Sequence, residues 1–375
     1  MEKCNWLDQL MGNSALAMPY NIDLDSQYFS VLKKKLSLLI NILKNGKASE
    51  GLISCAKNYS HKIIKTIRLY YKGKIIESHL LIRKLIKDCC RNNQFAVSDV
   101  NNSPSFPSPR KGECNEVQFF RARLCDHVVE FPAKEMLHIP FEKRTIVKSE
   151  RFSIPGLPCL YLGTSSYVCW IEMGCPPDFQ FNVSPVVLDN SQKIFNLTVA
   201  LQDFYNVLDY GKTNREERFC CLMKLFILNI ATSFNVKEAN RNFKSEYIIS
   251  QMIMLACKDL ELDGITYHSK RVSNDIFANI IGVNLVLFAK YDGECSLSKI
   301  CDHLEIGDSF NYSMFKQLLN SQKYKEYSLR IDSSFVFKNI GNFKRQFPYN
   351  ETEFYVFDKY LLANWDGRNL NKVNE

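Results

Sequence analysis

The residues from Phe119 to Glu172 combine cations, an aromatic ring and a carboxylate at spacings that suit a dinucleotide cleft. Arg121 lies in the strand-like segment FFRAR, and Arg151 begins the segment RFSIPG. The planar fork of arginine matches the two charges of a pyrophosphate better than the point charge of lysine does. The stretch CLYLGTSS predicts a buried strand followed by helix N-cap residues. Tyr161 and Glu172 are therefore expected to flank one strand-to-helix turn.

The order of these residues is similar to that of a known family. Arg121, Arg151, Tyr161 in LYLG, Glu172 in WIEMG and Ser269 in GITYHS, with the strand NLVLF after it, resemble the RES-domain family of bacterial proteins. That family is named for its Arg, Glu and Ser, and the resemblance covers about half of the chain.

The resemblance implies a fold related to ADP-ribosyltransferase toxins and cleavage of the nicotinamide–ribose bond of NAD. Water, phosphate or a protein is the acceptor in that family, so NAD is the expected substrate and inorganic phosphate one expected partner. Several members are toxins paired with an antitoxin, which implies an antitoxin or other regulatory protein as a further partner. One position departs from the pattern, because Glu150 stands where glycine is usual. Arg121 is therefore the better supported of the two arginines.

Cleavage of this bond builds positive charge on the ribose, so a carboxylate beside the sugar stabilises the transition state. Glu172 is the candidate for that role, with Arg121 and Arg151 as the pyrophosphate clamp. Tyr161 offers an aromatic face to the nicotinamide or its hydroxyl to the ribose. Ser269 is expected to orient a ribose or phosphate oxygen.

Each candidate also has an ordinary structural interpretation. Most glutamates lie on helix surfaces, a tyrosine in a strand commonly packs in the core, and Ser269 fits a turn. Arg123 lies on the same strand face as Arg121 and competes for its role. Arg144 and Arg151 are expected to lie on a loop, where a surface charge is the ordinary interpretation. Tyr247 and Gln251 are weaker candidates for the cleft.

The composition predicts a globular protein outside the membrane. Of the 375 residues, 46% are hydrophobic and 13% aromatic, which is too much for a disordered chain. The longest hydrophobic run, 219–234, is short and contains Lys224, so a buried helix is the better interpretation. The first residues, MEKCNWLDQL, lack the apolar core of a secretion signal, and we expect a cytoplasmic location.

The cysteines and histidines do not predict a metal site. The 14 cysteines form no CxxC pair, and no two of the six histidines are three to five residues apart. Zinc sites need such spacings. We therefore expect reduced thiols and no metal, and the sequence singles out no catalytic Cys–His pair.

The region 28–90 is predicted to form two or three amphipathic helices, and it is strongly basic. Residues 31–90 contain 14 Lys and Arg but three acidic residues, a net charge of +11, whereas the whole chain carries +8. This charge suits binding of nucleic acid. The favoured interpretation of this charge is a helical face that is exposed to water and kept soluble by its lysines.

The chain is predicted to be α+β, an ADP-ribosyltransferase-like RES sheet domain preceded by a basic helical module. The expected parts are the helical module 1–90, a Ser/Pro-rich linker 91–114, the catalytic domain 115–290 and an α/β C-terminal extension 291–375. Within the catalytic domain, strands are expected at EVQFFRARL, CLYL, SPVVLD, GITY and VNLVLFA, and helices at 219–234 and 245–260. In the extension, a helix is expected near 314–319 and strands at YSLRI, FVFKN and EFYVF.

The resemblance thus implies a RES-like NAD glycohydrolase or phosphorylase that acts as a bacterial toxin or defence effector. A mono-ADP-ribosyltransferase acting on a macromolecule is the second enzymatic interpretation. A non-enzymatic nucleic-acid-binding module is the alternative from another class. Because every candidate residue follows the linker, the first 110 residues are expected to be dispensable for NAD cleavage. The sequence leaves open which acceptor the enzyme uses, which oligomer it forms, and which antitoxin or trigger controls it.

Overall fold

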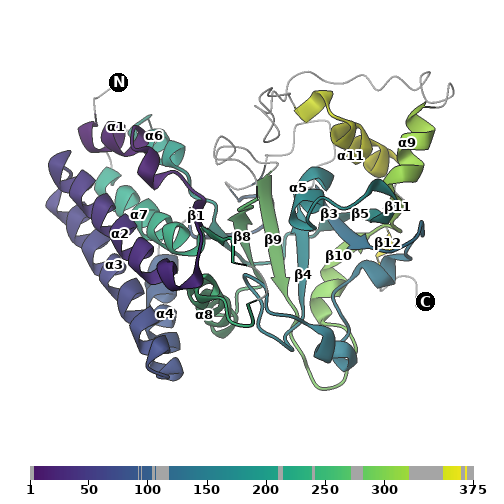
Figure 1. Cartoon of the computed structure of the whole chain (residues 1–375), viewed down its shortest axis with the longest axis horizontal. Coiled ribbons are helices and arrows are strands. Elements are labelled where there is room, and N and C mark those ends of the chain that lie inside the picture. Colours follow the sequence, from purple (N-terminus) through teal and green to yellow (C-terminus); the bar gives the residue numbers. More distant parts are fainter. Residues whose placement is uncertain are drawn as a thin grey trace.

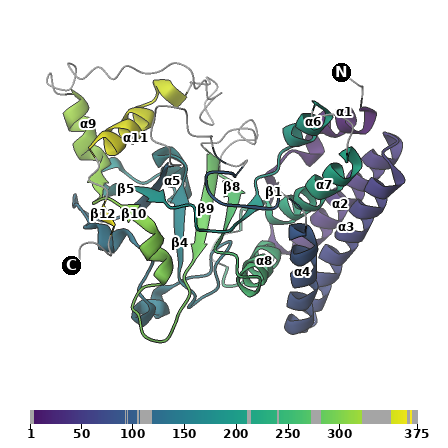
Figure 2. The same ribbon diagram turned by 180° about the vertical axis from the view of Figure 1, so that it is seen from behind.

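The computed structural model describes residues 4–91, 93, 95–103, 106, 118–209, 214–238, 241–271, 282–320, 349–364 and 368–369. Helices of the N-terminal region lie on one side of the molecule and a long twisted sheet on the other (Figure 1). Figure 2 shows the same arrangement from behind, with further helices at the far end of the sheet. The combination of a mixed sheet with segregated helices is an α+β architecture, as the sequence predicts.

The N-terminal region forms a short helix α1 (Asn5–Met11) and three long helices, α2 (Tyr28–Asn45), α3 (Glu50–Tyr71) and α4 (Ile75–Cys90). The predicted helices are confirmed, because apolar residues spaced three or four apart make one buried face on each helix. On α2 the buried residues include Leu32, Leu36, Leu39 and Leu43. The hydroxyl of Ser49 accepts a hydrogen bond from the backbone N–H of Leu52 and caps α3.

The main sheet contains ten strands in the described residues. Their order is β12 (Arg368–Asn369), β10 (Leu304–Ile306), β5 (Phe181–Leu188), β3 (Gln118–Leu124), β4 (Cys159–Gly163), β9 (Val283–Phe288), β8 (Gly264–His268), β6 (Ile194–Leu197) and β2 (Val97–Ser98), and β11 (Phe310–Asn311) also pairs with β5. Neighbours are antiparallel except β6 and β8, which are parallel. All five strands predicted for the catalytic domain are present.

The remaining helices cover the sheet or extend the N-terminal layer. They are α5 (Ser166–Glu172), α6 (Leu201–Asp209), α7 (Arg215–Thr232), α8 (Ile248–Asp259), α9 (Tyr312–Asn320) and α11 (Glu353–Ala363). α7 and α8 match the two helices predicted for the catalytic domain. α9 matches the helix predicted in the C-terminal extension.

One hydrophobic core joins the N-terminal helices to the sheet domain. It contains the buried faces of α2, α3 and α4 together with α7, α8 and side chains of β6, β8 and β9. α3 packs along α7, and α4 packs along α8. The predicted parts 1–90 and 115–290 therefore share their interior, although the Pro-rich segment between them reads as a linker.

A second link between these parts is a small parallel sheet. Strand β1 (Tyr20–Ile22) precedes α2, and strand β7 (Phe234–Val236) follows α7; the two pair in register along their whole length. The sequence carries no signal for this pair, because each strand has three residues and its partner lies more than 200 positions away.

Two predictions for the extension and the linker need correction. EFYVF is the first half of helix α11 and not a strand; its helical spacing buries Phe357 and Leu361 together, and Thr352 caps its first turn. Within the predicted linker, Val97 and Ser98 form β2 at the sheet edge, and Val100 and Phe106 are buried. The predicted strands YSLRI and FVFKN lie outside the described residues.

We predict that a chain beginning at Lys111 does not fold cooperatively. Without α2, α3 and α4, the apolar faces of α7 and α8 would be exposed to water, which reverses the expectation that the first 110 residues are dispensable. Denaturant unfolding followed by circular dichroism tests this, with Lys65→Ala in the full chain as control, since Lys65 is exposed on α3. A truncated chain that unfolds in one sharp transition would contradict the prediction.

Candidate functional site

A cavity of about 720 Å³ lies between the sheet and the N-terminal side of the molecule. Its floor is the face of β4, β8 and β9 that carries Tyr161, Tyr267 and Asn284. Successive side chains of a strand point to opposite faces, so Leu160, Leu285 and Leu287 fill the core behind this floor. Such a volume lies within the range of small-molecule and cofactor sites, roughly 300–1,000 Å³.

Glu172 enters the cavity from the last residue of α5. The amide of Asn284 donates a 2.8 Å hydrogen bond to its Oε1, and Arg271 Nε lies 3.8 Å from its Oε2. The side chain is 35% exposed, so it remains open to a ligand. Asn284 therefore orients the carboxylate while leaving part of it free.

Helix α5 begins as the sequence predicts. The hydroxyl of Ser165 accepts a hydrogen bond from the backbone N–H of Val168. A Cβ at Gly163 would lie 2.5 Å from a methyl of Val168 and 2.7 Å from Cys169 Sγ. Only glycine allows the helix to pack this closely on the end of β4.

The C-terminal extension also fixes α5. Asp358 of α11 accepts a 3.0 Å hydrogen bond from the backbone N–H of Ser166, and the hydroxyl of Tyr349 donates to the same carboxylate. Burial raises the pKa of Asp358 to about 7. Residues after 291 thus hold the helix on which Glu172 is placed.

Arg151 is the most unusual cation of the cavity. Its residue is 6% exposed, and its Nη1 donates a 2.9 Å hydrogen bond to the carbonyl oxygen of His268. Its Nε and Nη2 are buried without a hydrogen-bond partner. The guanidinium lies 4.8 Å from the ring centre of Tyr267, and burial lowers its pKa.

The loop that carries Arg151 is tied to α8 through one side chain. The amide nitrogen of Gln251 donates to Ser149 Oγ at 2.9 Å and lies within 3.3 Å of the carbonyl oxygens of Glu150 and Ser153. Gln251 does not line the cavity itself. Its contribution is to hold the neighbours of Arg151 in place.

Arg121 also lines the cavity, but its guanidinium already has partners. Nε donates to the carbonyl oxygen of Met136 at 3.2 Å, and Nη1 donates to that of Tyr161 at 3.1 Å. The competing Arg123 is not among the lining residues and pairs with Glu135 at 3.0 Å. Arg121 thus bridges β3 and β4, and two of its nitrogens are bound to backbone oxygens, whereas two nitrogens of Arg151 have no partner.

Tyr161 lines the cavity, and its hydroxyl is buried. Ser269 differs: it is buried at the end of β8 and is not among the lining residues. Its hydroxyl accepts a hydrogen bond from the backbone N–H of Arg271 at 3.2 Å. Ser269 therefore shapes the turn from which Lys270 and Arg271 reach the cavity.

Several lining residues were absent from the predicted site. Asn284 and Tyr267 lie on predicted strands. Asn284 alternates with Val283 and Leu285, and this alternation could have placed it on the open face. Asn235 and Arg241 had no such signal, since they lie between the predicted helices 219–234 and 245–260. Tyr247, which was a weak candidate, lines the cavity.

The cavity wall is rich in charge and more cationic than acidic. It contains Arg121, Arg151, Arg241, Lys244, Lys270 and Arg271 against Glu150, Glu172, Glu238 and Glu246. This surplus favours an anionic ligand. Among the described residues, no group of three His, Cys, Asp or Glu is arranged to hold a metal ion, and no helix is long and apolar enough to span a membrane. The thirteen described cysteines are free thiols.

Comparison with known proteins gives one relative in sequence. The chain is 30% identical over 356 residues to the protein described as "Putative toxin YopC" of Bacillus subtilis (strain 168), and the match covers 91% of this chain and 76% of that protein. The chain belongs to the YopC family. No protein-family model matches it.

Among solved structures, the YopC-family chain is similar to a chain of the M. tuberculosis MbcT–MbcA toxin–antitoxin complex. The identity is 10%, the TM-score is 0.30, and the match covers 64% of this chain and 97% of the other. A score of this size does not establish a common fold.

We predict that Lys270 makes the free energy of unfolding rise with pH above pH 7. Burial lowers the pKa of this amine to about 7, and its Nζ donates to the carbonyl oxygen of Phe234 at 2.6 Å. From pH 7 to the usual lysine pKa of about 10.4, the unfolded chain binds a proton that the folded chain lacks, so the free energy of unfolding rises with pH.

In Lys270→Met this contribution to the rise is absent, whereas Lys72→Met, at an exposed position, keeps the wild-type pH dependence. Urea unfolding at several pH values between 7 and 10 measures the effect. Parallel curves for wild type and Lys270→Met would contradict it.

Proposed function

We propose that this YopC-family protein is a toxin that cleaves the nicotinamide–ribose bond of NAD. The observation that carries the proposal is that two buried nitrogens of Arg151, Nε and Nη2, have no hydrogen-bond partner, and that Arg151 lines the same cavity as Glu172. The relative's description as a toxin and the resemblance of the five predicted residues to RES domains support the same function.

Arg151 would bind the pyrophosphate of NAD. Buried donors without partners cost free energy, and two phosphate oxygens would satisfy both at once. Arg121 adds a second positive charge, although two of its nitrogens are bound to backbone oxygens. The pyrophosphate would therefore be held mainly by Arg151.

Glu172 would act at the ribose next to the nicotinamide. When the bond between the nicotinamide nitrogen and C1′ breaks, its electron pair leaves with nicotinamide and positive charge develops on the sugar. A carboxylate fixed by Asn284 stabilises that charge without having to reorient. Water then adds to C1′ and releases a proton; with phosphate as acceptor the product is ADP-ribose 1-phosphate.

Tyr161 would contact the nicotinamide or the ribose, since its side chain lines the cavity. Ser269 would act through the turn that presents Lys270 and Arg271. An antitoxin partner and a cytoplasmic location complete the proposal and follow from the family resemblance and the sequence.

The direct test is incubation of the purified protein with NAD. We expect free nicotinamide to accumulate with ADP-ribose in phosphate-free buffer, and chromatography with and without phosphate identifies the acceptor. If the NAD is radiolabelled in its ADP-ribose part, label appearing on a macromolecule instead would favour the ADP-ribosyltransferase interpretation. No nicotinamide release under any of these conditions would contradict the proposal.

Glu172→Gln keeps the size of the side chain and removes its charge. Loss of one electrostatic contact in the transition state should cost on the order of 3 kcal/mol, or roughly a hundredfold in kcat, with KM nearly unchanged. Glu305→Gln, at an exposed position of β10, is the matched control and should behave as wild type. A folded Glu172→Gln protein with wild-type turnover would remove this residue from the mechanism.

A further inference from the structure

One wall of the cavity depends on the N-terminal segment. Asn235 and Val236 of β7 line the cavity, and β7 is paired with β1. The amide of Asn235 donates to the carbonyl oxygen of Lys270 at 2.7 Å, and Lys270 donates back to Phe234. The small parallel sheet thus anchors the turn that carries Lys270.

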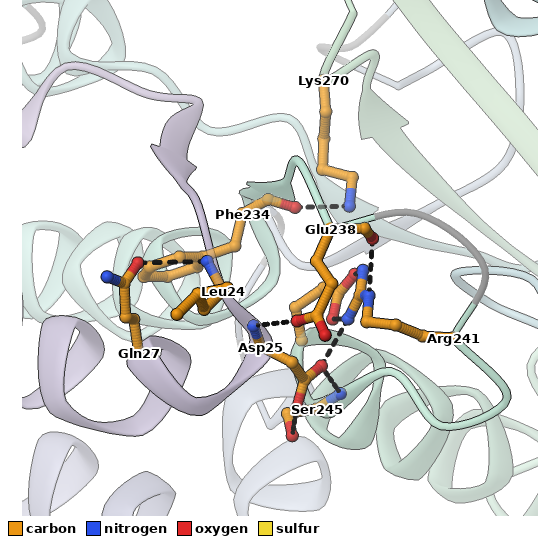
Figure 3. A network of polar contacts seen from close by, with 9 residues as sticks. Leu24, Asp25, Gln27, Phe234, Glu238, Arg241, Ser245 and Lys270 are labelled. Atoms are coloured by element: carbon orange, nitrogen blue, oxygen red, sulfur yellow. Dashed lines mark hydrogen bonds and ion pairs between the residues drawn. The ribbon is translucent and has the colours of Figure 1, made fainter.

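Asp25, just after β1, extends this connection to a second part of the wall. Figure 3 shows Asp25 facing Arg241 and Ser245. One carboxylate oxygen pairs with Arg241 Nη1 and accepts a 2.9 Å hydrogen bond from the backbone N–H of Ser245, and the other accepts the hydroxyl of Ser245. The backbone N–H of Asp25 donates to Glu238 at 2.9 Å.

Arg241 is committed to this network. Its Nη1 and Nη2 donate to the two carboxylate oxygens of the buried Glu246 at 3.0 and 2.9 Å, and its Nε donates to the carbonyl oxygen of Glu238 at 2.9 Å. These partners raise the pKa of Arg241. The side chains of Arg241 and Asp25 are 11% and 21% exposed, so the pair is shielded from solvent.

The network fixes the start of a continuous helical segment. Ser245 opens the short 3-10 helix η6 (Ser245–Tyr247), which leads directly into α8. Tyr247 projects from it into the cavity. One turn later, Gln251 holds the loop of Arg151. A displacement at Ser245 would therefore reach both Tyr247 and Arg151.

We propose that Asp25 of the N-terminal region is a positioning residue for nucleotide binding: it holds η6 and α8 where they orient Tyr247 and Arg151. The inference rests on the proposed function for the identity of the nucleotide. It gives the N-terminal region a role in positioning the site residues. This role is distinct from any contact of its basic surface with nucleic acid.

Asp25→Asn removes the ion pair but keeps the size of the side chain. We expect KM for NAD to rise roughly tenfold with kcat changed less than threefold, within the range of coupled neighbouring residues. Asp23→Asn is the control, because Asp23 pairs with Lys237 at an exposed position and should leave both constants unchanged.

A double-mutant cycle shows whether Asp25 acts through Arg241. If it does, Asp25→Asn combined with Arg241→Gln should raise KM no more than Arg241→Gln alone. An Asp25→Asn protein with wild-type KM would overturn the inference. If Asp25→Asn does not fold, Ser245→Ala removes only the hydroxyl contact and should raise KM in the same direction; an unchanged KM there would also overturn it.

Calorimetric binding of ADP-ribose separates this inference from the proposed function. Weaker ADP-ribose binding by Asp25→Asn, in a protein whose wild type releases no nicotinamide, would keep the positioning role and refute the enzymatic proposal. Nicotinamide release by wild type, together with equal ADP-ribose affinity of wild type and Asp25→Asn, would refute the positioning role alone. A wild type that neither releases nicotinamide nor binds ADP-ribose would refute both.

Discussion

The buried guanidinium of Arg151 is the constraint on which the site depends. One of its nitrogens is bound to a backbone carbonyl, and two are buried without partners. A desolvated cation with unpaired donors is expensive unless its surroundings stabilise it or an anion meets it. The ring of Tyr267 supplies part of that stabilisation, and a bound phosphate would supply the rest.

Segments from both ends of the chain hold the elements around this cation. Asp25 anchors η6 on one side, and Asp358 anchors the first turn of α5 on the other. The side chains that would touch substrate come from the middle of the chain, but their positions depend on residues more than 180 positions away. The helices α2, α3 and α4 share one core with α7 and α8, so the middle of the chain also depends on the N-terminal helices for its packing.

Much of the fold could be predicted from the sequence, because long periodic segments carry their own signal. The helices in the region 28–90, α7 and α8 follow from apolar spacing, and Ser165 predicted the start of α5. The prediction of a strand at EFYVF was wrong because five residues rich in aromatics fit a strand as well as a helix. The packing of Phe357 and Leu361 on one face favours the helix.

The site was predictable where a residue lies on a recognisable element. Arg121, Arg151, Tyr161 and Glu172 all line one cavity. Ser269 does not, and the rank of the two arginines was not predictable, since it depends on backbone carbonyls of Met136 and Tyr161 that happen to meet Arg121. The Asp25 network could not be predicted from the sequence either, because its partners come together only through the pairing of β1 with β7.

The central claim is that the unpaired donors of Arg151 bind the pyrophosphate of a dinucleotide, and equilibrium binding tests it most directly. Calorimetry should compare ADP-ribose with adenosine, which lacks the pyrophosphate, on wild type and on Arg151→Met. The account predicts that wild type prefers ADP-ribose at least about tenfold, as one charge-assisted hydrogen bond would give, and that Arg151→Met loses this preference. Equal preference in both proteins would contradict it.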